Sequence, residues 1–189
     1  SIFINLGSGG FFHPRWLNYD YPGISSFYKN LQGKKNVDFY PLNLEDKNLQ
    51  LPFKANSVSL IYCSHTLEHL SNESINIVIK ECKRVLVKNG ILRIVLPNTK
   101  YDFERAKTIC NQKSLSNIRE DLLIKTAKLT YSSINLINKD EYLSKINEAN
   151  YSSNKFAEMI EDNPKYQKIN EFDGSSPERH ISYLDHEIL

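Results

Sequence analysis

Short apolar runs of strand length recur through the first half of the chain. They cover residues 2–6, 16–19, 58–63 and 91–96, and an extended segment interrupted by a proline, at 37–44, makes a fifth. Runs that are apolar at consecutive positions are typical of strands buried on both faces of a parallel sheet. The pattern therefore predicts a mostly parallel sheet of about five or more strands.

One helix with a recognisable start and end lies between the last two runs. Ser71 is placed to cap a helix over residues 73–87, in which apolar side chains recur at helical spacing. Asn89 and Gly90 are typical residues for ending a helix. This order of strand, helix and strand favours an α/β fold.

After Asn98 the chain becomes polar, balanced in charge and helical in pattern. Three helices are predicted, around the apolar residues of 103–110, 115–129 and 156–160, the last capped by Ser153 and ended before Pro164. A block of this length is too long for a loop within the sheet. We therefore expect a helical insertion after the fifth strand.

The composition excludes several classes of protein. Hydrophobic residues make up 40% of the 189 positions, and the formal net charge of +2 lacks the basic bias of a nucleic-acid-binding module. No apolar run reaches the length of about 18 residues that a membrane span requires. Cys63, Cys82 and Cys110 form no short-spaced pair, which favours a reducing, cytoplasmic location.

A glycine-rich turn, Gly7-Ser8-Gly9-Gly10, directly follows the first apolar run, and Asp20 ends the second run. Glycines let the backbone approach a ligand closely, and an acid at the end of a second strand can accept both hydroxyls of a ribose. The path from Gly10 to Trp16 is too short for a crossover helix. Because a dinucleotide needs the N-terminus of that helix for its pyrophosphate, a nicotinamide-dependent enzyme is disfavoured.

Several segments together carry a family resemblance. NLGSGG at 5–10, LNL at 42–44, LPF at 51–53, SVSLIYCSHTLEHL at 57–70 and ECKRVLVKNGILRIVLPN at 81–98 occur in that order. The combination closely resembles the class I S-adenosylmethionine-dependent methyltransferases, in particular the small bacterial methyltransferase-11-like group. The resemblance implies a Rossmann-like α/β fold and S-adenosylmethionine as cofactor.

The resemblance also implies a set of cofactor-binding residues. The backbone of Gly7, Ser8 and Gly9 would line the methionine and ribose part, and Asp20 would bind the ribose. Asn43 and Leu44 would contact adenine, and Ser64 and His65 would lie next to the sulfonium. Asn5 replaces the acid that is common on the first strand of the family, which would weaken contact with the methionine amino group.

The resemblance gives the long polar block a role in a single methyltransferase domain over 1–189. We expect a cofactor-binding core at 1–98, a helical insertion or lid at 100–175, and the start of a return helix at 176–189. The insertion would wall the substrate pocket. A docked appendage, or a surface that forms a homodimer, is the alternative interpretation.

The acceptor side is predicted from residue type and place. His65 and His180 are candidate bases, and His13, Arg179 and His180 are candidate substrate contacts. The acceptor is expected to be small and polar, such as a hydroxyl or phosphoryl oxygen of a capsule or lipopolysaccharide precursor. No metal is expected.

Two other functions remain open at this stage. The first is a non-catalytic methyltransferase-like partner subunit. It stays open because Asn5, and Ser59 near the start of the fourth strand, stand where the family commonly has an acid. The second is a zinc hydrolase, because His65-Thr66-Leu67-Glu68-His69 matches the H-x-x-E-H motif. The motif is short, and His65 directly follows an apolar strand, so the two histidines need not share a helix face.

Overall fold

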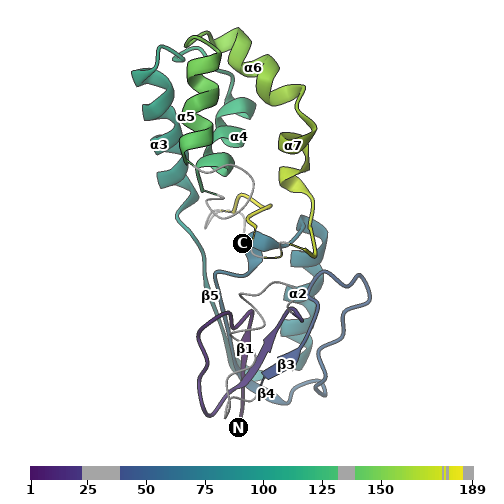
Figure 1. Cartoon of the computed structure of the whole chain (residues 1–189). Helices are drawn as coiled ribbons and strands as arrows, with labels where there is room; N and C mark the ends of the chain where they lie inside the picture. Colours follow the sequence, from purple (N-terminus) through teal and green to yellow (C-terminus); the bar gives the residue numbers. More distant parts are fainter. Residues whose placement is uncertain (23–38, 132–138, 176, 178, 185–189) are drawn as a thin grey trace. The chain divides into compact units, whose positions relative to one another are not determined.

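The computed structural model describes residues 1–22, 39–131, 139–175, 177 and 179–184 of the chain (Figure 1). The described residues form two compact units. The strand unit comprises residues 1–96 and 172–177, and the helical unit comprises 97–171 and 178–189.

The strand unit is built on a parallel sheet of five strands in the order β3-β2-β1-β4-β5. The strands are β1 (Ile2–Leu6), β2 (Leu17–Asp20), β3 (Phe39–Pro41), β4 (Val58–Ser64) and β5 (Leu86–Val95). Ile4, Val58 and Ile61 are fully buried in it. The predicted α/β fold with a mostly parallel sheet is confirmed, although residues 37 and 38 of the predicted third strand lie outside the described residues.

The connection from β1 to β2 is a turn without a helix, as the short path between the two strands predicted. The amides of Gly7 and Ser8 both donate to the carbonyl of Tyr19, at 2.8 and 3.1 Å. These bonds hold the glycine turn against the end of β2. At this turn a ligand that approached the carboxyl edge of the sheet would therefore meet backbone atoms instead of side chains.

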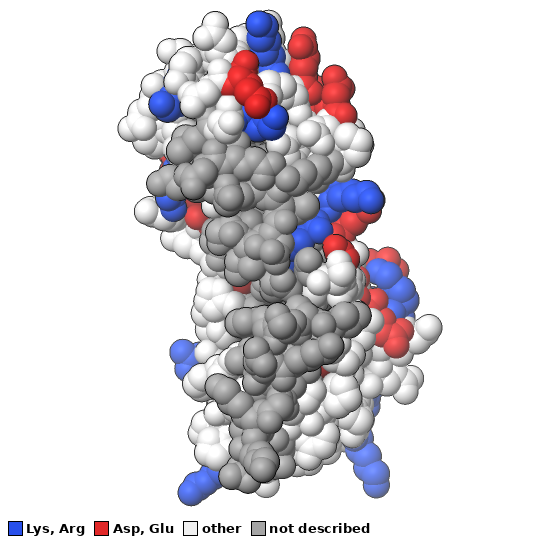
Figure 2. All heavy atoms as spheres, in the orientation of Figure 1, with Lys and Arg blue, Asp and Glu red and all other residues white. Residues whose placement is uncertain are grey.

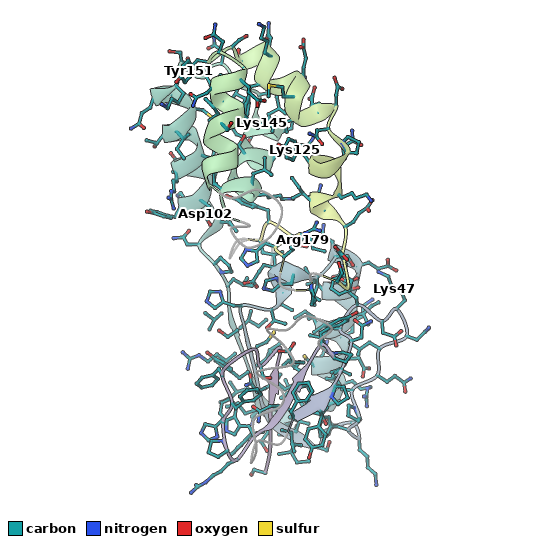
Figure 3. All side chains as sticks on the ribbon, in the orientation of Figure 1. Lys47, Asp102, Lys125, Lys145, Tyr151 and Arg179 are labelled. Carbon is teal, nitrogen blue, oxygen red and sulfur yellow. The ribbon has the colours of Figure 1, made fainter. Side chains whose placement is uncertain are left out.

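The helix α2 (Asn72–Val85) begins as predicted, because the Ser71 side chain accepts from the amide of Ser74. Glu45 reinforces this start by accepting from the Ser71 amide and hydroxyl. Lys47, labelled in Figure 3, donates to the Ser71 hydroxyl and pairs with Glu73 at 2.9 Å. Side chains from the loop before β4 thus hold the helix N-terminus.

The end of α2 differs from the prediction. The helix ends at Val85, and β5 begins at Leu86 instead of at residue 91. Between the pairs Val58–Leu86 and Leu60–Ile91 the register of the two strands shifts. Asn89 has φ of 63° in this shifted stretch, so Asn89 and Gly90 form a bulge in a strand instead of ending a helix.

The helical unit contains α3 (Thr99–Gln112), α4 (Glu120–Tyr131), α5 (Lys139–Glu148), α6 (Ser153–Glu161) and α7 (Pro164–Gln167). Figure 1 shows α3, α4 and α5 side by side, which agrees with the contacts between α3 and α4 and between α4 and α5. The core of this unit is a cluster of apolar side chains from all these helices and from the turns between them, among them Leu115, Leu129, Ile146, Phe156 and Ile169.

Three details of the helical prediction were wrong. Leu115 and Ile118 lie in the turn before α4, not within a helix. Ser152, not Ser153, caps α6, and its hydroxyl accepts from the amide of Lys155. A helix, α5, occupies a stretch for which none was predicted. Tertiary packing explains the first, because both residues are buried in the core without being helical.

Residues 179–184 contain no helix or strand. Residues 176, 178 and 185–189 of the predicted return helix lie outside the described residues, so that helix stays a prediction. The segment 179–184 is anchored inside the helical unit. The hydroxyl of Tyr183 donates to the carbonyl of Thr99, and Ile181 and Leu184 are buried.

All three cysteine thiols are buried and none is in a disulfide. Burial raises the pKa of Cys82 to about 12, so this thiol is protonated at neutral pH and behaves as a small core residue.

Among the described helices, none has the length and apolar character that crossing a membrane would require. In Figure 2 acidic and basic side chains are interspersed over the described part of the visible face.

Candidate functional site

A pocket lies at the carboxyl ends of the strands. This edge is where open α/β sheets bind ligands. Every lining residue belongs to the strand unit. The lining residues are Gly7, Gly9, Asp20, Tyr21, Leu42, Asn43, Leu44, His65, Thr66, His69, Leu70, Phe172 and Pro177.

The glycine turn supplies one wall of the pocket as bare backbone. Gly7 and Gly9 have φ of +66° and +51°, in the left-handed region that favours glycine. A Cβ on Gly7 would lie 2.1 Å from the Thr66 hydroxyl, whereas a Cβ on Gly9 would meet nothing within 4 Å. Gly9 therefore leaves room beside it for a ligand, and Gly7 is held closely against Thr66.

Asp20 is placed to accept hydrogen bonds from a ligand. Its Oδ2 accepts from the Gly9 amide at 2.6 Å and its Oδ1 from the Tyr21 amide at 2.7 Å. Burial raises the pKa of this carboxyl, and the two amides oppose that effect. A carboxylate offers about four lone-pair positions, so each oxygen keeps capacity for a further donor such as a ribose hydroxyl.

The segment after β3 supplies the facing wall. The amide of Leu42 donates to the Asp20 carbonyl at 2.7 Å, which fixes this segment beside β2. Asn43 Oδ1 accepts from the Glu45 amide at 2.9 Å, and Leu44 is buried. The Asn43 side chain is thus oriented by its own turn, with its amide nitrogen and a second lone pair on the oxygen remaining for a ligand.

His65 and Glu68 meet at the end of β4. His65 has φ of 51° and lines the pocket. Its Nδ1 lies 3.3 Å from Glu68 Oε1, and the carboxyl is buried while the imidazole is exposed. Burial raises the pKa of Glu68 to about 7, so this carboxyl changes its charge near neutrality.

Six of the residues predicted to bind cofactor or substrate do not line the pocket, and four of these belong to the strand unit. Asn5 is buried, and its amide donates to the Phe11 carbonyl at 2.8 Å and to Asn18 Oδ1 at 3.1 Å. The Ser8 hydroxyl is buried beneath the turn. Ser64 ends β4, and His13 stacks on Trp16 with ring centroids 4.7 Å apart. In this structure the side chains of Asn5 and His13 therefore contact the connection between β1 and β2 or the start of β2.

Arg179 and His180 belong to the helical unit. Arg179, labelled in Figure 3, is buried, and its guanidinium donates to the Lys168 carbonyl at 2.9 Å. Their relation to the pocket in the strand unit stays a prediction.

Several lining residues were missed by the sequence analysis. Tyr21 and Leu42 are immediate neighbours of predicted residues, so the resemblance could have included them. Thr66 lies inside the H-x-x-E-H match at 65–69, and no role of its own was predicted for it. Phe172 and Pro177 carry no sequence signal, because they lie far along the chain from every strand.

The H-x-x-E-H match does not form the helical zinc motif. His65 follows β4 directly in a left-handed conformation, and only Leu67–His69 form a short 3-10 helix. A zinc site of that kind needs two histidines on one helix face. His65 and His69 therefore do not share one helix face, as the position of His65 directly after a strand predicted. The zinc hydrolase interpretation itself stays a prediction.

Residues 6–94 match the family model described as a methyltransferase domain. The match covers just under half of the chain. It runs from the end of β1 into β5 and includes every described lining residue except Phe172 and Pro177. No curated protein matches the chain.

Similar solved structures share little sequence with this chain. A chain of the complex between the Trm112 methyltransferase activator of Haloferax volcanii and a methyltransferase is 16% identical, with TM-score 0.40, and the likeness covers 57% of this chain and 51% of that one. The YcgJ protein of Bacillus subtilis is 18% identical over 84% and 80%, with TM-score 0.39. A methyltransferase of Bacillus halodurans is 18% identical over 88% and 81%, with TM-score 0.38. This chain thus spans about half the length of the first of these proteins.

The glycine turn and the acid at the end of β2 lie within residues 6–94, the part of the chain that matches the methyltransferase domain family. Residues 6–94 belong to the methyltransferase domain family that the model describes. S-adenosylmethionine is the cofactor of such domains, and the residues present fit it. Gly9 leaves open space for a ligand, and Asp20 keeps free acceptor positions. The predicted family and cofactor are confirmed.

Proposed function

We propose that the protein transfers the methyl group of S-adenosylmethionine to a small polar acceptor. The observation that carries the proposal is the pocket in which Asp20, Gly7 and Gly9 converge with the segment 42–44 at the carboxyl edge of the sheet. The bound cofactor supplies an electrophilic methyl on a sulfonium whose sulfur keeps the bonding electron pair. The protein then mainly has to orient the acceptor.

Each lining residue takes a role that its chemistry supports. Asp20 accepts the ribose hydroxyls through the lone pairs that the Gly9 and Tyr21 amides leave over. Asn43 and Leu44 contact the adenine. The backbone at Gly7, Ser8 and Gly9 borders the methionine and ribose part, and the side chain of Asn5 holds that turn.

His65 is the proposed base for a hydroxyl acceptor. It removes the proton from the acceptor oxygen, whose lone pair forms the new bond to the methyl carbon. Its Nδ1 lies against Glu68, which leaves Nε2 as the nitrogen for proton transfer. Ser64 lies beside it at the end of β4. His180 is the second candidate base.

The acceptor is proposed to be a hydroxyl or phosphoryl oxygen of a capsule or lipopolysaccharide precursor in the cytoplasm of a bacterium. His13, Arg179 and His180 are the proposed contacts to it. The helical segment 100–175 would act as a lid or wall of the acceptor site, or form a homodimer. The support is residue type alone, since the buried Arg179 and the half-buried His180 suit an anionic or polar acceptor.

A second candidate function is that of a non-catalytic partner subunit. Asn5 favours it, because its amide is committed to Phe11 and Asn18 and offers no carboxylate to the methionine amino group. Formation of S-adenosylhomocysteine with any acceptor would separate an enzyme from such a subunit.

Binding of the cofactor is tested by calorimetry with S-adenosylmethionine on wild type and Asp20→Ala. We expect the variant to bind at least about tenfold more weakly, because hydrogen bonds to a charged group contribute about 1.5–3 kcal/mol. Asp121→Ala is the control, since Asp121 is exposed and pairs with Arg119 on the surface. Equal affinity of Asp20→Ala and wild type would remove Asp20 from the cofactor site.

A further inference from the structure

The short segment Phe172–Pro177 belongs to the strand unit although the residues on both sides of it, up to Glu171 and from Glu178, belong to the helical unit. Two of its residues, Phe172 and Pro177, line the cofactor pocket. They are the only described lining residues outside the stretch that matches the methyltransferase domain family. This wall of the pocket is therefore a feature of this chain beyond the matched domain.

The segment is fitted to the side chain of Tyr21. The rings of Tyr21 and Phe172 meet edge to face, with centroids 5.5 Å apart and an interplanar angle of 72°. A Cβ on Gly174 would lie 2.6 Å from the Tyr21 hydroxyl oxygen. The absence of a side chain at Gly174 thus lets the segment close over the end of the tyrosine.

A local turn fixes the shape of the segment. Asp173 Oδ1 accepts from the Ser175 amide at 2.9 Å and from the Ser175 hydroxyl at 2.7 Å. Such side-chain-to-backbone bonds define an Asx turn. Phe172 is thus presented to the pocket by a structured turn.

The position of Tyr21 indicates which part of a ligand this wall would meet. Tyr21 directly follows Asp20, and its amide donates to the Asp20 carboxylate. The segment 42–44 lines the same pocket and is bonded to Asp20 through the Leu42 amide. A ligand whose ribose hydroxyls bind Asp20 would place its base between these elements.

We propose that Phe172, supported by Tyr21, forms an aromatic wall that binds the nucleoside half of the cofactor. The inference rests on the proposed function, because it takes S-adenosylmethionine as the ligand. Aromatic rings stack on nucleobases, and each such contact contributes about 1–3 kcal/mol to binding. A contact between Tyr21 and Phe172 that served packing alone would not require both rings to line a pocket.

Calorimetry with S-adenosylhomocysteine on the full chain tests the wall. We expect Phe172→Ala to raise the Kd about tenfold and Phe172→Tyr to keep the wild-type affinity. Tyr101→Ala is the matched control, because Tyr101 is exposed on α3 and does not line the pocket. Circular dichroism verifies that each variant is folded. Wild-type affinity in a folded Phe172→Ala would overturn the inference.

A nucleoside fragment identifies the half that is bound. With 5′-methylthioadenosine, which lacks the amino acid, we expect the same relative loss in Phe172→Ala as with S-adenosylhomocysteine. A loss confined to S-adenosylhomocysteine would overturn the assignment to the nucleoside half. If the wild-type protein bound neither compound, the proposed function itself would fail. If wild type and Phe172→Ala bound both compounds equally, only the inference about the aromatic wall would fail.

Gly174→Val gives a second route to the same question without substituting a lining residue. Its side chain would displace the Tyr21 ring, and we expect about a threefold to tenfold rise in Kd for S-adenosylhomocysteine, a fraction of the stacking contribution. An unchanged Kd in this variant, together with an unchanged Kd in Phe172→Ala, would show that the wall does not contact the cofactor.

Discussion

At the scale of single residues, the close approach of Gly7 to Thr66 sets the shape of the glycine turn. We expect Gly7→Ala to lower the free energy of unfolding by about 3 kcal/mol or more, because a Cβ there would overlap the Thr66 side chain at 2.1 Å as well as strain a positive φ. Urea unfolding measures the change.

Gly9→Ala is the matched control for that variant. Gly9 has a positive φ like that of Gly7, but a Cβ added at Gly9 would meet nothing within 4 Å. The expected cost is about 1 kcal/mol, from backbone strain alone. Equal costs in the two variants would show that Thr66 does not press against Gly7.

From the raised pKa of Glu68 we expect the free energy of unfolding to depend on pH. The pKa of this carboxyl is about 7 in the fold against 4.5 as the ordinary value, and burial is the cause. Between these two values the folded state holds the proton more tightly than the unfolded state. Stability therefore falls as pH rises from about 4.5 to about 7 and levels off above, by up to about 3 kcal/mol in all.

Glu68→Gln tests this assignment, because a glutamine cannot ionise. Denaturant unfolding at several pH values should show that the fall in stability between pH 4.5 and 7 is smaller in the variant. We also expect the variant to be more stable than wild type above pH 7. A wild-type pH profile in Glu68→Gln would assign the pH dependence to other groups.

At the scale of elements, two neighbouring serines, Ser152 and Ser153, are candidates for the N-cap of α6. The structure assigns the cap to Ser152, whose hydroxyl accepts from the Lys155 amide, whereas the sequence pattern favoured Ser153. Loss of a cap costs about 1 kcal/mol. We expect Ser152→Ala to destabilise the protein by about that amount and Ser153→Ala to change little, as measured by thermal unfolding.

The opposite ranking of the two serine variants would restore the sequence-based boundary of α6.

At the start of β5, strand pairing overrides the local sequence signal for a helix end. Asn89 and Gly90 are suited to ending a helix, yet Leu86 already pairs with Val58 on β4. Asn tolerates the left-handed conformation that the resulting bulge requires.

At the scale of the whole molecule, the two compact units have separate cores. Phe156 is fully buried in the helical unit and Ile61 in the strand unit. We expect Phe156→Ala, at a cost of about 3–5 kcal/mol, to reduce amide hydrogen-exchange protection mainly in α3 to α6. Ile61→Ala should do so mainly in β1 and β4. A uniform loss in both variants would indicate one cooperative unit.

The sequence by itself determined the parallel strands, the missing first crossover helix, the glycine turn, Asp20 and the start of α2. These features depend on local patterns: consecutive apolar residues, the number of residues between two strands, and a serine three positions before the amide it caps. The candidate pocket was predicted as far as residues 7, 9, 20, 43, 44 and 65, all of which lie at strand ends.

Only the tertiary structure decided the rest. Phe172 and Pro177 reach the pocket from more than a hundred residues beyond β4, and no local pattern encodes such a return. Asn5 and His13 contact Asn18 on β2 and Trp16 just before it, and these contacts between different segments follow from packing instead of from local sequence. Glu68 gained its raised pKa from burial, which is a property of packing and not of the sequence motif around it.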